Sequence, residues 1–195
     1  LSRTLQGLRE MHRILRPSGK LLILEFSRPP LLKRRPRSIV QVIDKTLEIM
    51  RPWLEARKIR VVQYSAAGLP QVMADAEQLK QVFTNLLNNA AEAMPGGGNI
   101  SITSAAEPNA DGSISLVIRI RDHGQGIPDD VRPRMFEPFF TTKDDGTGLG
   151  LCIAASIMAR HGGQLLLESS TPDGTTFAVR IPATAERSNG QDPRR

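Results

Sequence analysis

Cysteine, aromatic residues and long apolar runs are all scarce in this chain of 195 residues. The single cysteine, Cys152, cannot form a disulfide within the chain, which favours a reducing compartment, and we expect it to fill a small core position. Aromatic residues make up only 4% of the sequence, so a stacking platform for nucleic-acid bases is not expected. No apolar run approaches the roughly 20 residues that a membrane-spanning helix needs. We therefore expect a cytoplasmic domain without a membrane span.

The net charge of +6 is distributed in a way that argues against nucleic-acid binding. Basic residues gather in a proline-punctuated stretch at residues 33–37 and at the last two positions of the chain. No helix-turn-helix pattern accompanies them, so we expect no nucleic-acid partner.

Composition divides the chain into four parts. Residues 1–30 form an N-terminal segment, residues 31–37 a linker, and residues 183–195 a polar tail that we expect to be disordered. Residues 38–182 are long enough to form one domain with a sizeable core.

Helical and strand periodicities alternate within residues 38–182. Apolar stripes predict helices over 38–54, with Ser38 as a possible cap, 76–94 and 149–160. Strands are predicted over 59–64, 71–73, 99–104, 113–121, 164–169 and 175–181. The proline- and glycine-rich residues 123–147 predict a long loop. This order indicates an α+β sandwich with helices on one face of a mainly antiparallel sheet.

The helix predicted over 76–94 carries a polar stripe beside its apolar stripe. Asn85, Asn89 and Glu92 are spaced i, i+4 and i+7, about 100° round the helix from the apolar stripe. Oxygens on one narrow stripe can bind a hard cation such as Mg²⁺, which also keeps water and substrate phosphates as ligands. A solvated polar face explains the same spacing.

Asp122 ends a predicted strand and leads into Gly124 and Gly126. A carboxylate there can accept a hydrogen bond from an exocyclic amino group, and glycines let the backbone approach a flat ring closely. An ordinary strand-to-loop turn would explain these residues as well.

Residues 146–150 read Gly-Thr-Gly-Leu-Gly and open the third predicted helix. Glycine amides and a helix N-terminus form an anion site suited to phosphates. The run does not end in the Gly-Lys-Ser/Thr of a Walker A loop, so it is a different phosphate motif.

In this order the three motifs resemble the N, G1 and G2 boxes of the catalytic ATP-binding domain of sensor histidine kinases, within the gyrase, heat-shock-90 and mismatch-repair ATPase superfamily. Phe136–Phe140 resembles the F box, and Gly174–Phe177 resembles the last glycine motif. The resemblance covers about residues 36–182. It implies a Bergerat-type fold, a two-layer sandwich on a mixed, mainly antiparallel sheet with a long ATP lid.

The resemblance also implies roles for the matched residues, with ATP and Mg²⁺ as cofactors. Asn89 would ligate Mg²⁺. Asn85, Glu92 and Lys143 would act beside the phosphates. The remaining contacts with ATP would come from Asp122, at the adenine amino group, and from Gly124, Gly126, Ile127, Thr142, Gly146, Thr147, Gly148, Leu149, Gly150, Leu151 and Thr175.

Residues 128–147 would then be the mobile ATP lid, anchored by Phe136, Phe139 and Phe140, although packing of an apolar cluster explains these phenylalanines equally. His161, in a His-Gly-Gly run, is interpreted as a helix terminus where a cation opposes the helix dipole.

A complete histidine kinase also needs a phosphoacceptor histidine, in His-Glu-x-x-x-Pro, on a dimerising helical hairpin. Only His12 precedes the ATP-binding region, and Arg13 replaces its acidic partner. The stretch from His12 to Phe26 is also too short for that hairpin. We therefore expect this chain not to phosphorylate itself, and its partners to be an acceptor hairpin and a response regulator, in the cytoplasmic part of a sensor.

Residues 8–28 also resemble ubiquinone/menaquinone-type C-methyltransferases, where a helix ends at Pro-Gly-Gly and enters a strand. The glycine loop for S-adenosylmethionine is missing from the sequence, so a fusion, a gene fragment or an assembly artefact would explain the segment equally. Three functions remain: a histidine kinase domain, a nucleotide-binding regulatory module without kinase activity, and a partial methyltransferase. The intact nucleotide motifs favour the first.

Overall fold

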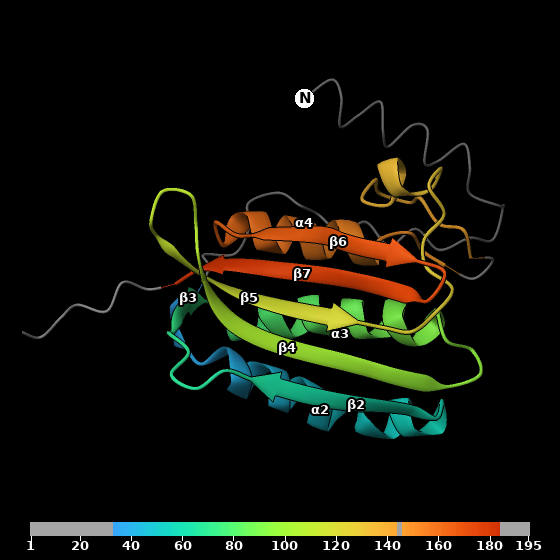
Figure 1. Ribbon diagram of the computed structural model, residues 1–195, viewed down its shortest axis with the longest axis horizontal. Coiled ribbons are helices and arrows are strands. Elements are labelled where there is room, and N and C mark those ends of the chain that lie inside the picture. The colour runs from blue at the N-terminus through green and yellow to red at the C-terminus, as the bar shows by residue number, and fades with distance from the viewer. Residues whose placement is uncertain (1–32, 144–145, 184–195) are drawn as a thin grey trace, which may run out of the picture. The chain divides into compact units, whose positions relative to one another are not determined.

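The computed structural model describes residues 33–143 and 146–183, which form an α+β sandwich (Figure 1). The main sheet has the strand order β2-β4-β5-β7-β6. Strand β2 runs parallel to β4, and the other neighbouring strands are antiparallel. The strands are Ile59–Ser65 (β2), Gly98–Pro108 (β4), Ile114–Arg121 (β5), Gln164–Thr171 (β6) and Gly174–Pro182 (β7). The predicted fold class is confirmed.

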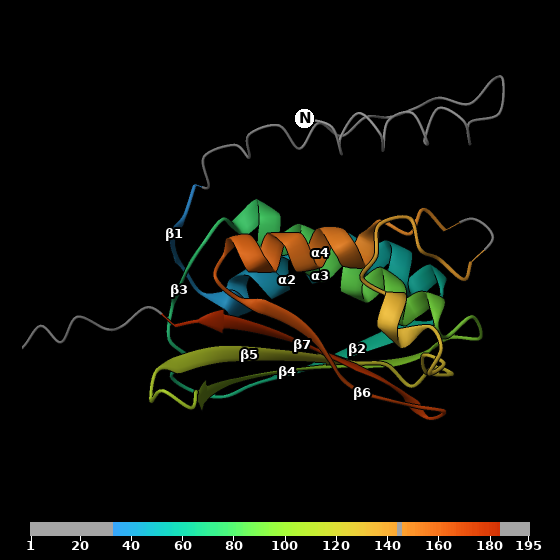
Figure 2. The ribbon, with the colours of Figure 1, turned by 90° about the horizontal axis from the view of Figure 1, so that it is seen from above.

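Three helices lie on one face of this sheet, as Figure 2 shows. They are α2 (Ile39–Ala56), α3 (Ala76–Glu92) and α4 (Gly150–Arg160). Helix α3 begins after Asp75, whose carboxylate accepts hydrogen bonds from the N–H groups of Glu77 and Gln78. Ser38 occupies the equivalent position before α2, but its side chain makes no capping hydrogen bond, so the predicted cap is correct only in position.

The core lies between the helices and the sheet. Apolar residues on α2 and α3 are buried at helical spacing, while alternate residues of the central strands face them, among them Ile118 and Ile120 of β5. Each fully buried aliphatic or aromatic side chain contributes about 1.5–3 kcal/mol through removal of apolar surface from water. The charged residues of β5 lie on the other face, where Arg119 pairs with Glu107 and Glu168.

A second, two-stranded sheet joins β1 (Arg35–Arg37) and β3 (Val72–Ala74) in antiparallel register. The last three residues of the predicted linker therefore form a strand, and that part of the linker prediction is wrong. Three residues are too few for the alternation of a strand to be visible in the sequence. The N-terminal segment with His12 lies outside the described residues, as does the tail beyond residue 183.

His161 ends α4, and its predicted charge is wrong. The side chain is 4% exposed, and burial lowers the pKa of its imidazole below the ordinary histidine value. Nε2 lies 3.0 Å from the backbone nitrogen of Asp75 and accepts its N–H, while Nδ1 lies 2.8 Å from the carbonyl oxygen of Ile157. His161 is thus a neutral link between α4 and the start of α3.

Candidate functional site

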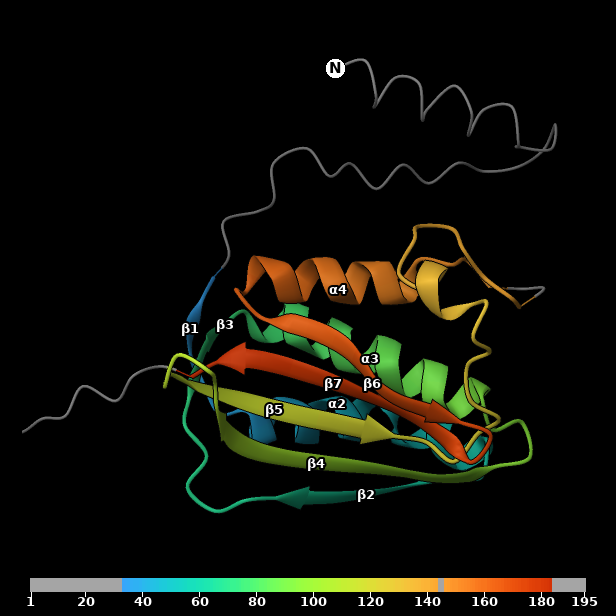
Figure 3. The same ribbon diagram turned by 45° about the horizontal axis from the view of Figure 1, so that its top comes forward.

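The lid segment leaves the end of β5 and returns to the chain at the start of α4 (Figure 3). Within this predicted loop, Arg132–Arg134 forms one turn of 3₁₀ helix. A cavity of about 740 Å³ lies among α3, the lid and the start of β7. Most of the predicted site residues line it: Asn85, Asn89, Glu92, Asp122, Gly126, Ile127, Thr142, Lys143, Gly146, Thr147, Gly148, Gly150, Leu151 and Thr175.

Two predicted contact residues, Gly124 and Leu149, lie behind the cavity wall. A Cβ at Gly124 would lie 2.6 Å from the carbonyl oxygen of Ala93, so this glycine allows the G1 loop to pack against the end of α3. Leu149 precedes α4, and its carbonyl oxygen accepts the N–H of Ile153. Both residues shape the wall without forming it.

The sequence interpretation missed several lining residues. The polar ones carried a signal that could have been used, because Asn88 and Gln125 adjoin motif residues. Val131 and Met135 lie in the lid outside any motif and carried no such signal, whereas Ala93 and Phe177 belong to the motif segments at the end of α3 and the start of β7. The missed residues are Asn88, Ala93, Gln125, Pro128, Val131, Met135, Thr141 and Phe177, while Phe140, predicted only as a lid anchor, also lines the cavity.

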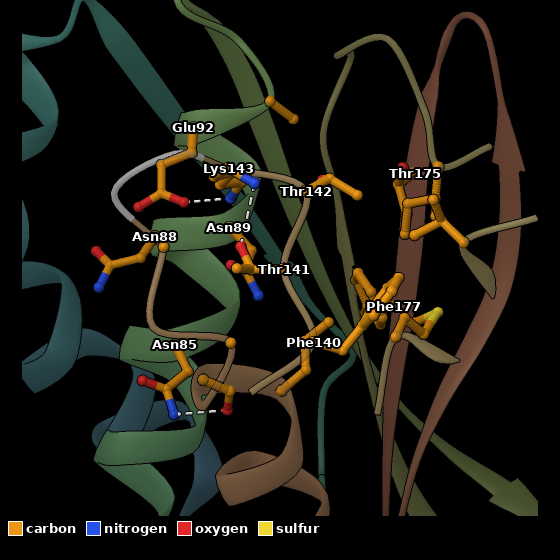
Figure 4. Close-up of a pocket in the computed structure, with 18 of the residues that line it drawn as sticks. Asn85, Asn88, Asn89, Glu92, Phe140, Thr141, Thr142, Lys143, Thr175 and Phe177 are labelled. Carbon is orange, nitrogen blue, oxygen red and sulfur yellow. Dashed lines mark hydrogen bonds and ion pairs between the residues drawn. The ribbon is translucent and has the colours of Figure 1, made fainter. Parts of the chain in front are cut away.

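The polar stripe of α3 faces the cavity, as predicted. In Figure 4, Asn85, Asn89 and Glu92 extend from one helix toward the lid. The side-chain amide of Asn85 donates a 2.9 Å hydrogen bond to the carbonyl oxygen of Gly150. Asn85 therefore joins α3 to the first residue of α4. This bond connects the expected phosphate site, at the start of α4, to α3, which carries the expected metal ligand Asn89.

Lys143 and Glu92, both predicted to act beside the phosphates, contact each other. The Lys143 ammonium group forms an ion pair with the Glu92 carboxylate (Figure 4). Both side chains are 45% exposed, so solvent screens the pair and each group can exchange its partner for a ligand.

Asp122 is a buried acid in the lining of the cavity. Its side chain is 3% exposed, and burial raises the pKa of its carboxyl group above the ordinary value, while backbone hydrogen bonds oppose this rise. Oδ1 accepts the N–H groups of Gly124, at 2.9 Å, and Thr175, at 3.2 Å. Both of these bonds use Oδ1, so Oδ2 is the carboxylate oxygen offered to a ligand.

The glycine run before α4 has a backbone that only glycine fits. Gly148 has φ +64°, and a Cβ there would lie 2.4 Å from the carbonyl carbon of Phe139. The carbonyl oxygen of Gly148 accepts the N–H of Phe139, at 3.0 Å, and Phe139 itself has φ +66°. The amides of the first turn of α4 have no partner within the helix, as at any helix start, and are suited to an anion.

Cys152 lies in that first turn and is only half-buried, outside the apolar core. The prediction of a core position is therefore wrong, because the glycine run brings the start of α4 to the cavity edge. Burial nevertheless raises the pKa of its thiol.

Residues 33–143 and 146–183 contain no group of three or more His, Cys, Asp and Glu side chains that could hold a metal ion. None of their helices combines the length and apolar character that crossing a membrane requires.

Residues 74–185 match the family model described as histidine kinase-, DNA gyrase B-, and HSP90-like ATPase. The chain belongs to this family. The sequence motifs predicted the ATP-binding domain of sensor histidine kinases, which belongs to this family. The predicted family is therefore confirmed.

Two-component kinases are among the relatives of the chain. It is 33% identical over 176 residues to sporulation kinase E of Bacillus subtilis (strain 168), covering 89% of this chain and 23% of that protein. It is 35% identical over 194 residues to the sensory histidine kinase/phosphatase NtrB of Azospirillum brasilense, covering 94% of this chain and 48% of NtrB. The chain thus spans half or less of the length of these relatives.

Solved histidine kinases share the fold. The catalytic domain of histidine kinase ThkA gives a TM-score of 0.68 at 30% identity, covering 78% of this chain and 97% of that one. Full-length ShkA in complex with AMPPNP gives a TM-score of 0.69 at 29% identity, covering 81% of this chain and 33% of ShkA. The structure of ThkA with its response regulator protein TrrA gives a TM-score of 0.68 at 27% identity, covering 95% of this chain and 50% of that one.

Proposed function

We propose that this domain binds Mg-ATP in the cavity and transfers its γ-phosphoryl group to a histidine of an acceptor hairpin. The observation that carries the proposal is the pairing, in one cavity, of a buried carboxylate with an anion site at a helix start. The first fits an amino-bearing base and the second fits a phosphate chain.

Adenine belongs at the carboxylate end. Asp122 offers Oδ2 as an acceptor for the exocyclic amino group, and the N–H of Thr175 holds the carboxylate in place through Oδ1. Gly126, with φ +75°, and Ile127 form the adjoining wall. Guanine presents a carbonyl oxygen where adenine has its amino group, so an ionised Asp122 favours ATP over GTP.

The phosphates belong at the start of α4. Gly146, Gly148 and Gly150 line that end of the cavity, and Lys143 supplies a cation beside it. Asn89 fits Mg²⁺ as a single amide ligand, and the metal would supply charge neutralisation between phosphate oxygens. The chain's own groups hold ATP in line with the acceptor. Such positioning is most of what a protein contributes to phosphoryl transfer.

In the transfer, an imidazole nitrogen of the acceptor bonds to the γ-phosphorus while the bond to the β–γ bridging oxygen breaks. ADP leaves and the imidazole loses its proton. The acceptor hairpin and a response regulator are therefore the proposed partners, as the complex of ThkA with TrrA illustrates for that kinase. A cytoplasmic location is part of this proposal, and the proposed use of ATP and the free thiol of Cys152 support it.

The test is phosphoryl transfer in trans. The chain is incubated with radiolabelled Mg-ATP, with and without an acceptor hairpin carrying His-Glu-x-x-x-Pro. We expect acid-labile label on the hairpin and none on this chain. Label on this chain that disappears in His12→Gln would contradict the expectation that it does not phosphorylate itself. ATP binding without label on any acceptor hairpin from related kinases would favour a nucleotide-binding regulatory module instead.

A further inference from the structure

One arginine joins the beginning of the lid to the sheet. Arg132 donates from Nε to the carbonyl oxygen of Ile127, at 3.0 Å, and from Nη2 to the carbonyl oxygen of Ser170, at 2.9 Å. Nη1 lies 2.9 Å from the carboxylate of Asp129, which holds the guanidinium from the lid side. Three nitrogens of one planar group therefore bind three acceptors, two of them backbone oxygens 43 residues apart in the chain.

Ser170, on β6, completes this connection from the sheet. Its Oγ accepts the N–H of Ile127 at 2.7 Å and lies 3.4 Å from the hydroxyl of Thr175. Ile127 is thus held at its N–H by Ser170 and at its carbonyl oxygen by Arg132. The preceding Gly126 packs so closely that a Cβ would lie 2.2 Å from the carbonyl oxygen of Thr171, so no side chain fits between this part of the wall and β6.

The residues held in this way form the wall of the cavity near Asp122. Gly126, Ile127 and Thr175 line the cavity, whereas Arg132 and Ser170 are not part of its lining. The N–H of Thr175 also donates to Asp122. Arg132 and Ser170 therefore act on a ligand only through the backbone they hold.

We propose that Arg132 and Ser170 are positioning residues that fix the base wall of the nucleotide pocket and so set its affinity and selectivity for adenine. The proposal rests on the placement of adenine at Asp122. Lysine cannot replace Arg132, because a single ammonium nitrogen cannot bind two carbonyl oxygens and a carboxylate in the geometry of the planar fork.

The experiment compares the two ends of the pocket by calorimetry in the folded domain. The probes are adenosine, ATP, GTP and inorganic triphosphate. The variants are Arg132→Lys and Ser170→Ala. The control is Arg60→Lys, an exposed arginine on β2 at the opposite edge of the sheet.

We expect both variants to bind adenosine and ATP about tenfold more weakly, because each removes hydrogen bonds to the base wall. Binding of inorganic triphosphate stays unchanged, and the ratio of ATP to GTP affinity falls. The control keeps all four affinities. Unchanged adenosine affinity in both variants, or an equal loss for adenosine and triphosphate, overturns the proposal. Ser170→Ala removes only a hydroxyl, so it keeps the test valid if Arg132→Lys is too unstable to study.

Asp122→Asn separates this inference from the proposed function. If Asp122→Asn weakens adenosine binding while Arg132→Lys and Ser170→Ala do not, only the positioning role is overturned. If Asp122→Asn leaves adenosine binding intact, the placement of adenine is wrong and the positioning role falls with it.

Discussion

Lys143 in the lid and Glu92 near the end of helix α3 form an ion pair at the wall of the nucleotide cavity. An exposed pair of this kind contributes at most about 1 kcal/mol to stability. The pair matters more for ligand binding, because the Lys143 ammonium group, which is expected to contact phosphate, already contacts the Glu92 carboxylate. If Lys143 contacts the phosphates as proposed, nucleotide binding exchanges its Glu92 partner for the ligand.

Glu92→Gln should raise the affinity for ATP in the absence of Mg²⁺ by about two- to fivefold. The change frees Lys143 and removes a negative charge beside the phosphates. Calorimetry in EDTA measures this, with Glu48→Gln on the exposed face of α2 as the control. An unchanged or lower affinity would show that the ion pair does not compete with the ligand. Phosphoryl transfer by the same variant should nevertheless fall, because the family resemblance implies that Glu92 acts beside the phosphates.

Asn85 and Asn89 of α3 should differ in how their substitution changes the metal dependence of ATP binding. Asn89→Ala should remove most of the gain in ATP affinity that Mg²⁺ gives, about tenfold, because the amide ligand is lost. Asn85→Ala loses the hydrogen bond to Gly150 and should weaken ATP about three- to tenfold both with and without Mg²⁺. Titrations of both variants in Mg²⁺ and in EDTA check this. Identical metal dependence of the two variants would contradict the assignment of Asn89, but not Asn85, as the metal ligand.

Asp122→Asn should stabilise the ligand-free domain while weakening ATP about 10- to 100-fold. The asparagine oxygen can still accept from Gly124 and Thr175, but its amino group faces the adenine amino group. Because burial raises the pKa of Asp122, its ionised form lowers stability at neutral pH, and the neutral amide avoids that loss. The Tm advantage of the variant should therefore shrink as the pH falls toward the ordinary aspartate pKa of about 3.9, and be lost below it. A lower Tm at pH 7 would contradict this reasoning.

Stability should fall as the pH drops below about 6.5, the ordinary pKa of histidine, because His161 has a lowered pKa. The unfolded chain then takes up a proton that the buried imidazole resists, and a protonated Nε2 could not accept the N–H of Asp75. Urea unfolding at pH 7.5 and 5.5 measures the slope, which His161→Gln should flatten. His123→Gln, at an exposed position, is the matched control and should keep the wild-type slope. Equal slopes in all three proteins would refute the role of His161.

Residues 128–143 of the lid should become more protected from hydrogen exchange when an ATP analogue binds. Without nucleotide, few of their side chains are buried, although Met135 belongs to the core. Exchange should slow most after Phe136, toward Lys143, since Arg132 already holds the beginning of the lid. Equal protection with and without the analogue would contradict lid closure.

The sequence was most informative where residue type and spacing jointly restrict the structure. The stripe of Asn85, Asn89 and Glu92 could be placed because helical spacing determines which face each residue occupies. Asp122 and Gly148 could be placed because few residues other than a carboxylate and a glycine suit their surroundings.

What the sequence could not show depends on long-range contacts. The bonds from Arg132 to Ser170 join residues far apart in the chain, and neither residue belongs to a motif. The neutral state of His161 depends on its burial between two helices, whereas its sequence context suggests an exposed helix end. Strand β1 exists only because β3 pairs with it.

The hydrogen bond from Phe139 to Gly148 closes a ring of chain around residues 140–147. The entropy lost on closing a loop grows only slowly with loop length. Here the loop is already closed in the ligand-free domain. ATP therefore meets a lid whose chain is already joined at Phe139 and Gly148. Gly148→Ala, which places a side chain at this positive-φ closure, should consequently open the ring and weaken nucleotide affinity.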